Sequence, residues 1–312
     1  MGSKFYKEPN FYRGISFPTS SIGLVDPVAH RVRRQVLNPL FTAGRVQTIA
    51  PKLQTKIEQL CVKLDEFAHA DKAVNLYAAF KSVTMDIVSE MIFGESFGVT
   101  NYPGFRHPHL DALHDAVKKA WVFRTYPTLG WLSLNMPDWI SSNLFPVPIV
   151  EFGKVCVTIF LTRPRDITLM MFRPIQQLCQ KRIDKYLEDR QSLEKKVSSE
   201  VLERLLDPDA ARGHLVPNAC DLNEEALTLL TAGNDTTSNA MILGAYFICS
   251  HPEVATRLVE ELRNTFPGAC DSITYEKAKD MPYLVCDRSS VCVCNPQQYV
   301  IAVLCGVENV NC

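Results

Sequence analysis

The chain of 312 residues carries 33 basic and 34 acidic side chains, and 46% of its residues are hydrophobic. This composition is typical of a chain that buries a substantial core, and it excludes a disordered or low-complexity protein. A net charge of −1 gives no reason to expect nucleic acid as a partner. As written, the sequence shows neither a signal peptide nor an apolar run long enough to span a membrane, so we expect a cytoplasmic protein.

Apolar residues recur at helical spacing almost throughout residues 26–284, so the fold class is predicted to be mostly α. No strand-type alternation and no repeat at a fixed period stands out. Pro51 is expected to begin one helix, and Asn75 and Gly94 are expected to cap the next. In chain order, the predicted helices cover a region near residues 26–41, a stretch from residue 51, and residues 75–94, 110–121, 175–194, 199–206, 221–249 and 252–266.

The predicted helix near residues 26–41 carries a basic face. Asp26 suits the N-cap position, and Pro27 suits the first helical position. His30 and Arg34 are four residues apart and therefore share one face of the helix. Two cationic donors at that spacing can bind a pair of carboxylates or phosphates, although a solvated basic face has the same pattern.

The long predicted helix over residues 221–249 has poor helix formers at its centre. The Thr236 hydroxyl is expected to bond back to the carbonyl of Ala232 and to loosen the helix there. Gly233 lacks a side chain, which predicts a widened groove where a flat ligand can approach the backbone. Asp235 beside Thr236 pairs an acid with an alcohol, which suits proton delivery to a bound small molecule. The same sequence pattern is also expected of a kinked helix in the core whose threonine hydroxyl is hydrogen-bonded to its own backbone.

Together these signatures resemble the cytochrome P-450 superfamily of heme-thiolate monooxygenases, in a fungal form. The resemblance rests on Ala-Gly-x-Asp-Thr-Thr at residues 232–237 and on the spacing of His30 and Arg34. It also rests on Leu-Asn-Pro-Leu-Phe at residues 37–41 and on Cys-Ser-His-Pro-Glu at residues 249–253. A partial domain of this family is therefore expected over residues 1–284.

The resemblance implies a role for each of these site residues. His30 and Arg34 match positions that bind the heme propionates, with His30 in place of the more usual Trp. Ala232 and Gly233 match residues that lie over the heme face. Asp235 and Thr236 match the acid–alcohol pair that relays protons to dioxygen. The iron ligand itself is assigned to no residue of this chain.

The same resemblance implies hydroxylation of an apolar small molecule, in fungal secondary metabolism. It implies heme with its iron as the cofactor and an NADPH-dependent flavoprotein reductase as the electron-donating partner. Full-length members are usually anchored to the endoplasmic reticulum membrane.

The sequence departs from the family pattern after Leu284. The family continues with a Glu-x-x-Arg helix and then a Phe-x-x-Gly-x-Arg-x-Cys-x-Gly loop, whose cysteine binds the iron. Neither follows here, and without a proximal thiolate the iron lacks the electron donation that drives O–O cleavage. We therefore expect the chain as written to be truncated and inactive, and the alternative is a non-catalytic helical remnant or scaffold.

Two segments do not fit the helical pattern, one near residues 155–172 and the other over residues 285–312. Each begins with Val-Cys, a pair that the codons GTA-TGT encode, and GTATGT is a common fungal 5′ splice signal. The hypothesis is that both segments are translated introns. Two natural insertions are the alternative.

A terpene cyclase-like all-α enzyme is a remote alternative. Asn234, Asp235 and Ser238 begin the magnesium-binding motif of that family, whose three ligands at i, i+4 and i+8 lie on one helix face. The third ligand position is Ile242, however, and the chain contains no Asp-Asp-x-x-Asp cluster.

Eleven cysteines are present, and none forms the Cys-x-x-Cys pair that suggests zinc. Five of them crowd the last segment. The other six are scattered singly and are expected to be buried, reduced thiols: Cys61, Cys156, Cys179, Cys220, Cys249 and Cys270.

Overall fold

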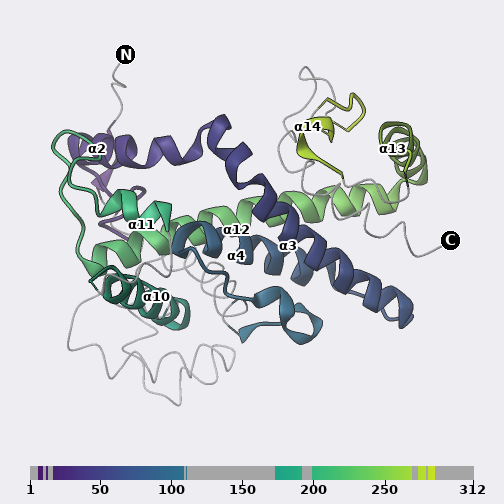
Figure 1. Cartoon of the computed structure of the whole chain (residues 1–312), viewed down its shortest axis with the longest axis horizontal. Helices are drawn as coiled ribbons and strands as arrows, with labels where there is room; N and C mark the ends of the chain where they lie inside the picture. The colour runs from purple at the N-terminus through teal and green to yellow at the C-terminus, as the bar shows by residue number, and fades with distance from the viewer. Residues whose placement is uncertain are drawn as a thin grey trace, which may run out of the picture. The chain divides into compact units, whose positions relative to one another are not determined.

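The computed structural model describes residues 6–9, 12, 17–108, 110, 173–191, 199–268, 273–278 and 280–284 (Figure 1). These residues form α-helices, 3-10 helices and loops, and no strand occurs among them, so the mostly-α prediction is confirmed. The helix predicted over residues 110–121 lies outside the described residues apart from Leu110. Both anomalous segments, 155–172 and 285–312, also lie outside them.

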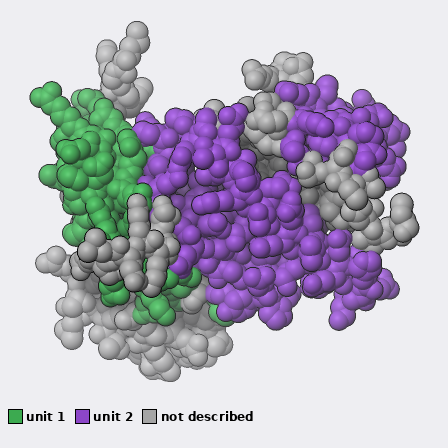
Figure 2. Space-filling model, in the orientation of Figure 1, with its two compact units in different colours: residues 1–37, 108–198, 202–228 green, residues 38–107, 199–201, 229–312 purple. Residues whose placement is uncertain are grey.

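The chain divides into two compact units, coloured green and purple in Figure 2. Unit 1 comprises residues 1–37, 108–198 and 202–228, and unit 2 comprises residues 38–107, 199–201 and 229–312. Helices α11 (Glu200–Leu205) and α12 (Ala219–Ser250) contribute residues to both units. The central helix predicted over residues 221–249 is thus confirmed, and α12 continues without a break in Figure 1.

Unit 1 contains α2 (Pro27–Leu37), α10 (Arg173–Gln191) and the first part of α12. Asp26 caps α2 as predicted, because its carboxylate accepts hydrogen bonds from the backbone N–H groups of Val28 and Ala29 at 3.3 and 3.0 Å. The side chain of Asn223 joins α12 to α10 by donating to Gln180 Oε1 at 2.7 Å and to a backbone carbonyl of α10.

Unit 2 contains α3 (Ala43–His69), α4 (Leu76–Phe93), the rest of α12, α13 (Pro252–Thr265) and α14 (Tyr275–Ala278). Three 3-10 turns accompany them: η1 (Asn38–Phe41), η2 (Val99–Asn101) and η3 (Pro103–Phe105). One core cluster joins α3, α4 and α12 through the buried side chains of Ile57, Leu60, Leu64, Ala79, Phe80, Val83, Ile87, Phe105, Met241 and Ala245.

Helix α4 carries the caps that its sequence predicts. The side chain of Asn75 accepts a hydrogen bond from the N–H of Ala78 at 3.2 Å. Gly94 ends the helix in the left-handed conformation, with φ of 73°, where a residue without a side chain is favoured. Inside the helix, the buried carboxylate of Asp86 accepts hydrogen bonds from the backbone of Val99 and Thr100, both at 2.8 Å, and so holds η2 against α4.

The prediction that Pro51 begins a helix is wrong. Helix α3 begins at Ala43, and Pro51 lies inside it. A proline is well suited to the first turn, but further along a helix it removes one backbone hydrogen bond and its ring crowds the carbonyl group four residues earlier. Burial of the apolar stripe of α3, including Leu60 and Leu64, outweighs that local loss.

Of the six cysteines expected to be buried, the four that the structure describes are less buried than the sequence suggested. Cys156 and Cys270 lie outside the described residues. Cys179 is buried and Cys61 is partly buried, but Cys220 and Cys249 are exposed near the two ends of α12. Their apolar neighbours predicted burial without showing which face of the helix each thiol occupies. None of the described helices is both long enough and apolar enough to cross a membrane.

Candidate functional site

One face of α12, which we call the outer face, carries only uncharged side chains. Thr236 Oγ1 donates to the carbonyl oxygen of Ala232 at 2.6 Å, so the predicted back-bond is confirmed. Both residues are exposed. The outer face consists of Ala232, Thr236, Asn239, Leu243, Tyr246 and Phe247, which recur at helical spacing. A flat apolar group can lie along this surface.

Gly233 lies on the other side, the inner face, where α12 packs on α4. A Cβ atom at Gly233 would lie 2.8 Å from Val88 Cγ2, which is closer than non-bonded carbon atoms approach each other. The absent side chain therefore makes room for α4. The interpretation that it opens a groove for a ligand finds no support on this side, because Val88 occupies the space.

Asn234 bonds the inner face to α4. Its side chain is buried, and Nδ2 donates to the carbonyl oxygen of Lys81 at 2.8 Å and to Thr84 Oγ1 at 3.0 Å. Ser238, one turn further along, is also buried and donates to the carbonyl oxygen of Asn234 at 2.6 Å. These two side chains, which the terpene cyclase alternative needs for magnesium, are thus engaged in helix packing.

The carboxylate of Asp235 is engaged by α4, whereas the hydroxyl of Thr236 bonds to its own helix. The carboxylate forms an ion pair with Lys81 Nζ of α4, on the inner side of α12. Neighbouring residues of a helix point about 100° apart, so the acid and the alcohol leave α12 in different directions. Lys81 was missed at the sequence level. The available signal was a charged residue within Phe80-Lys81-Ser82-Val83, in a helix that is otherwise buried on several sides.

His30 and Arg34 lie on α2 and belong to unit 1, whereas residues 232–237 of α12 belong to unit 2. Arg34 is exposed and His30 is half-buried. Burial lowers the pKa of His30 below its usual value, and the cations of Lys7 and Arg34 lower it further, against an opposing effect of Glu225. Near neutral pH this favours the uncharged ring of His30, which can donate one hydrogen bond, whereas Arg34 is a cation.

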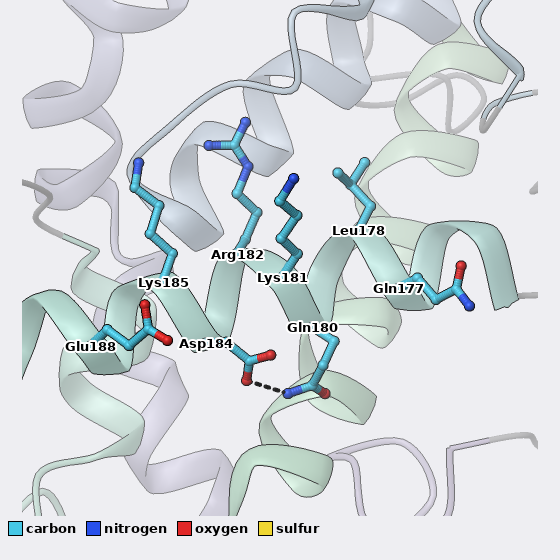
Figure 3. A pocket seen from close by; sticks show the side chains of 8 residues that line it. All are labelled: Gln177, Leu178, Gln180, Lys181, Arg182, Asp184, Lys185 and Glu188. Carbon is cyan, nitrogen blue, oxygen red and sulfur yellow. Dashed lines mark hydrogen bonds between the residues drawn. The ribbon is translucent and has the colours of Figure 1, made fainter.

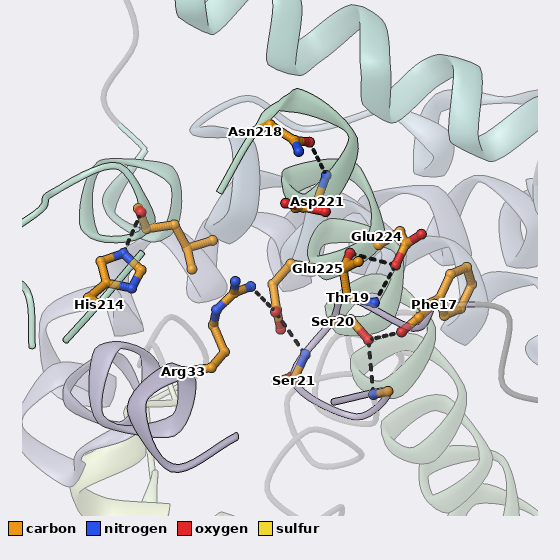
Figure 4. Close-up of polar contacts among 12 residues, drawn as sticks. Phe17, Thr19, Ser20, Ser21, Arg33, His214, Asn218, Asp221, Glu224 and Glu225 are labelled. Atoms are coloured by element: carbon orange, nitrogen blue, oxygen red, sulfur yellow. Dashed lines mark hydrogen bonds and ion pairs between the residues drawn. The ribbon is translucent and has the colours of Figure 1, made fainter. Parts of the chain in front are cut away.

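Beneath this face, Arg33 anchors α2 to α12 (Figure 4). Its guanidinium donates to Glu225 Oε2 at 2.8 Å, and both side chains are buried. The same oxygen accepts the backbone N–H of Ser21 at 2.9 Å. The neighbouring Glu224 accepts the N–H and the hydroxyl of Thr19, both at 2.7 Å. Two adjacent glutamates of α12 thus fix α2 and the loop before it.

A depression of about 720 Å³ lies along α10 (Figure 3). Its lining is mostly charged or amide-bearing: Gln177, Leu178, Gln180, Lys181, Arg182, Asp184, Lys185 and Glu188. In Figure 3 the amide of Gln180 points to Asp184, with which it forms a hydrogen bond of 2.8 Å. This lining does not suit the apolar small molecule that the sequence predicts as substrate.

Each unit, taken by itself, holds residues whose chemistry suits one part of a heme. Arg34 offers a permanent cation for a carboxylate, and the outer face of α12 offers an uncharged surface for a flat ring. The cysteine loop that supplies the axial ligand in the family is not found in the sequence. Within the described ranges, no cluster of three or more His, Cys, Asp or Glu side chains can hold a metal ion. The axial bond therefore has no assigned residue.

A family model described as cytochrome P-450 matches residues 2–286. The chain belongs to this family. The cytochrome P-450 monooxygenase sol6 of Alternaria solani is 37% identical over 284 residues, which cover 91% of this chain and 56% of the relative. The grayanic acid biosynthesis cluster cytochrome P-450 monooxygenase of Cladonia grayi is 24% identical over 89% of this chain and 48% of its own length.

Among solved structures, the heme domain of cytochrome P450DA shares the fold with a TM-score of 0.64. The identity is 15%, and the match covers 90% of this chain and 53% of that domain. The chain therefore spans about half the length of the cytochrome P-450 proteins it matches.

Proposed function

We propose that this chain supplies part of the heme pocket of a fungal cytochrome P-450 monooxygenase. The enzyme would hydroxylate an apolar small molecule in secondary metabolism. The observation that carries the proposal is the outer face of α12, which combines small or uncharged side chains with the back-bonded hydroxyl of Thr236. The names of the relatives from Alternaria solani and Cladonia grayi, a monooxygenase and a biosynthesis-cluster monooxygenase, support the activity and its setting.

His30 and Arg34 would hold the propionates, and Ala232 would lie against the ring. Arg34 can bind a carboxylate through two parallel N–H groups, whereas neutral His30 donates a single hydrogen bond. Heme, when bound, supplies the iron at which dioxygen is reduced. Thr236 already donates its proton to Ala232, so its oxygen remains able to accept a hydrogen bond from a water molecule on the outer face. Asp235 is the acid that would supply protons, as the family resemblance implies.

Membership of the family is what supports a proposal for the electron-donating partner and for the cellular location of the full-length protein. We propose that electrons come from an NADPH-dependent flavoprotein reductase. Attachment of the full-length protein to the endoplasmic reticulum stays a prediction. Both need an assay on a full-length protein, because the chain spans about half the length of its relatives.

The segments near residues 155–172 and over residues 285–312 are proposed to be translated introns. The family match ends at residue 286, close to the start of the second segment, which supports this for the tail. Sequencing the mature transcript across both segments tests the proposal. A transcript without them, continuing into Glu-x-x-Arg and the cysteine loop, is expected. A transcript that retains both in every copy would contradict it.

Heme binding tests the proposed function most directly. We expect the protein translated from the spliced transcript, reduced and treated with carbon monoxide, to give the red-shifted Soret band of a thiolate-bound heme. The 312-residue chain under the same conditions should lack it. Absence of the band from both proteins would reject the proposal in favour of a non-catalytic scaffold.

A further inference from the structure

We propose that Lys81 is a positioning residue for Asp235. Its ammonium group holds the carboxylate on the inner side of α12, so the acid is kept off the face on which the Thr236 hydroxyl stands. The geometry of the pair is independent of the proposed function. Its consequence for proton delivery rests on that function.

The ion pair is sheltered. The side chain of Lys81 is 7% exposed and that of Asp235 is 22% exposed. The ammonium also lies over the ring of Tyr77, 5.6 Å from its centroid, which adds a second favourable contact for the charge. A buried ammonium needs such partners because removal from water disfavours its charge. Lys81 therefore has little freedom to leave Asp235 for solvent.

The neighbouring contacts fix where the ammonium points. Asn234 Nδ2 donates to the backbone carbonyl of Lys81 itself, at 2.8 Å, and also to Thr84 Oγ1. Val88 fills the space beside Gly233. These contacts set the register of α4 against α12, and the register places Lys81 Nζ at Asp235.

This arrangement has a consequence for the acid–alcohol pair. Asp235 can serve a group on the outer face only after its side chain rotates away from Lys81. The strength of the ion pair thus sets how often the acid is present on that face. A substitution at Lys81 should change proton delivery although its ammonium group contacts Asp235 and the ring of Tyr77, both away from the Thr236 hydroxyl's own bond to Ala232.

The first test concerns the pair itself and needs no heme. Urea unfolding is measured for the 312-residue chain and for K81M, D235N and the double variant. Each single variant leaves one buried or half-buried charge unpaired, so the two effects should not add. The expected coupling is about tenfold in the unfolding equilibrium constant.

The matched control is a second lysine–carboxylate pair in unit 2. Lys56 and Glu90 join α3 and α4 at 3.1 Å, with side chains 17% and 23% exposed. The cycle of K56M and E90Q should give a coupling below about fivefold, because the pair is more solvated. Additive effects of K81M and D235N would overturn the proposal. If K81M alone fails to fold, recovery of folding in the double variant demonstrates the coupling, and continued failure overturns it.

The second test separates positioning from structure. It uses the protein translated from the spliced transcript, loaded with heme and passing the carbon monoxide test. A failure of that test rejects the proposed function, and the unfolding cycle then decides on Lys81 alone. Product formed per NADPH consumed should fall by about a hundredfold in D235N. K81M should exceed the wild type, because Asp235 is then free to turn towards the outer face. K81R should be close to the wild type, and K56M should match it.

A charge swap completes the experiment. Lys81→Glu combined with Asp235→Lys restores an ion pair but leaves no carboxylate on α12 at this position. Stability should return towards that of the wild type while product formation stays low. Product formation at the wild-type level in both K81M and the swap would assign Lys81 a structural role alone.

Discussion

The two faces of α12 differ although their residues lie within one short motif. On the inner face, Gly233, Asn234 and Asp235 are all engaged by α4, through a close approach, two hydrogen bonds and an ion pair. On the outer face, Ala232 and Thr236 contact each other and are otherwise exposed. The motif therefore serves two purposes, because three of its six residues hold the helix in place while Ala232 and Thr236 present a surface.

Helix α2 has the same organisation in unit 1. Arg33 is buried in an ion pair with Glu225, whereas Arg34, the next residue, is exposed. His30 shares the face of Arg34 and is half-buried. On both helices, residues adjacent in sequence are thus divided between packing and a surface open to a ligand, which follows from the 100° between successive side chains.

The largest expected difference between the faces of α12 comes from its apolar side chains. Met241 is 1% exposed in the core with α3 and α4, whereas Leu243 is 62% exposed. Met241→Ala should lower the free energy of unfolding by about 2–5 kcal/mol, because it leaves a cavity. Leu243→Ala should change it by less than about 0.5 kcal/mol. Urea unfolding measures both, and equal losses would show that another surface covers Leu243.

The next effect concerns the close approach of α4. Gly233→Ala should lower the free energy of unfolding by about 1–3 kcal/mol, because the new methyl group would overlap Val88. The matched control is Gly44→Ala in α3, where a Cβ would meet nothing within 4 Å. That change should raise stability by about 0.5–1 kcal/mol through helix propensity. A gain at both positions would contradict the packing assigned to Gly233.

Two asparagines give a third comparison. Asn234→Ala removes two hydrogen bonds of a buried side chain and should cost about 1–2 kcal/mol. Asn239 is exposed on the outer face, and its change to alanine should alter stability by less than about 0.5 kcal/mol. Thermal unfolding of the two variants side by side measures the difference. Similar melting temperatures would argue against a role for Asn234 in joining α4 to α12.

The smallest effect is a pH dependence of stability that arises from His30 on α2. Because the folded chain lowers the pKa of His30, the unfolded chain binds its proton at higher pH. This contribution to stability is fully present above the ordinary pKa of 6.5 and is lost as the pH falls below it, towards the folded value. Unfolding between about pH 8 and about pH 5 should therefore show a steeper decline for wild type than for His30→Gln. Parallel curves would contradict the lowered pKa.

Local signals in the sequence determined several features of this protein. The caps at Asp26, Asn75 and Gly94 and the back-bond of Thr236 all follow from residues within four positions, where hydrogen bonds need only the local backbone. The extent of α12 follows from its apolar period and the motif at its centre from residue identity. These were enough to predict the fold class and, by resemblance, the family.

Tertiary structure decided the rest. Nothing near Asp235 in the sequence indicates that its partner is Lys81, 154 positions away. The same holds for Val88 beside Gly233, for the buried stripe that carries α3 across Pro51, and for the exposure of Cys220. Each depends on which face of a helix meets another helix, and that choice comes from packing the whole core rather than from the residues on either side.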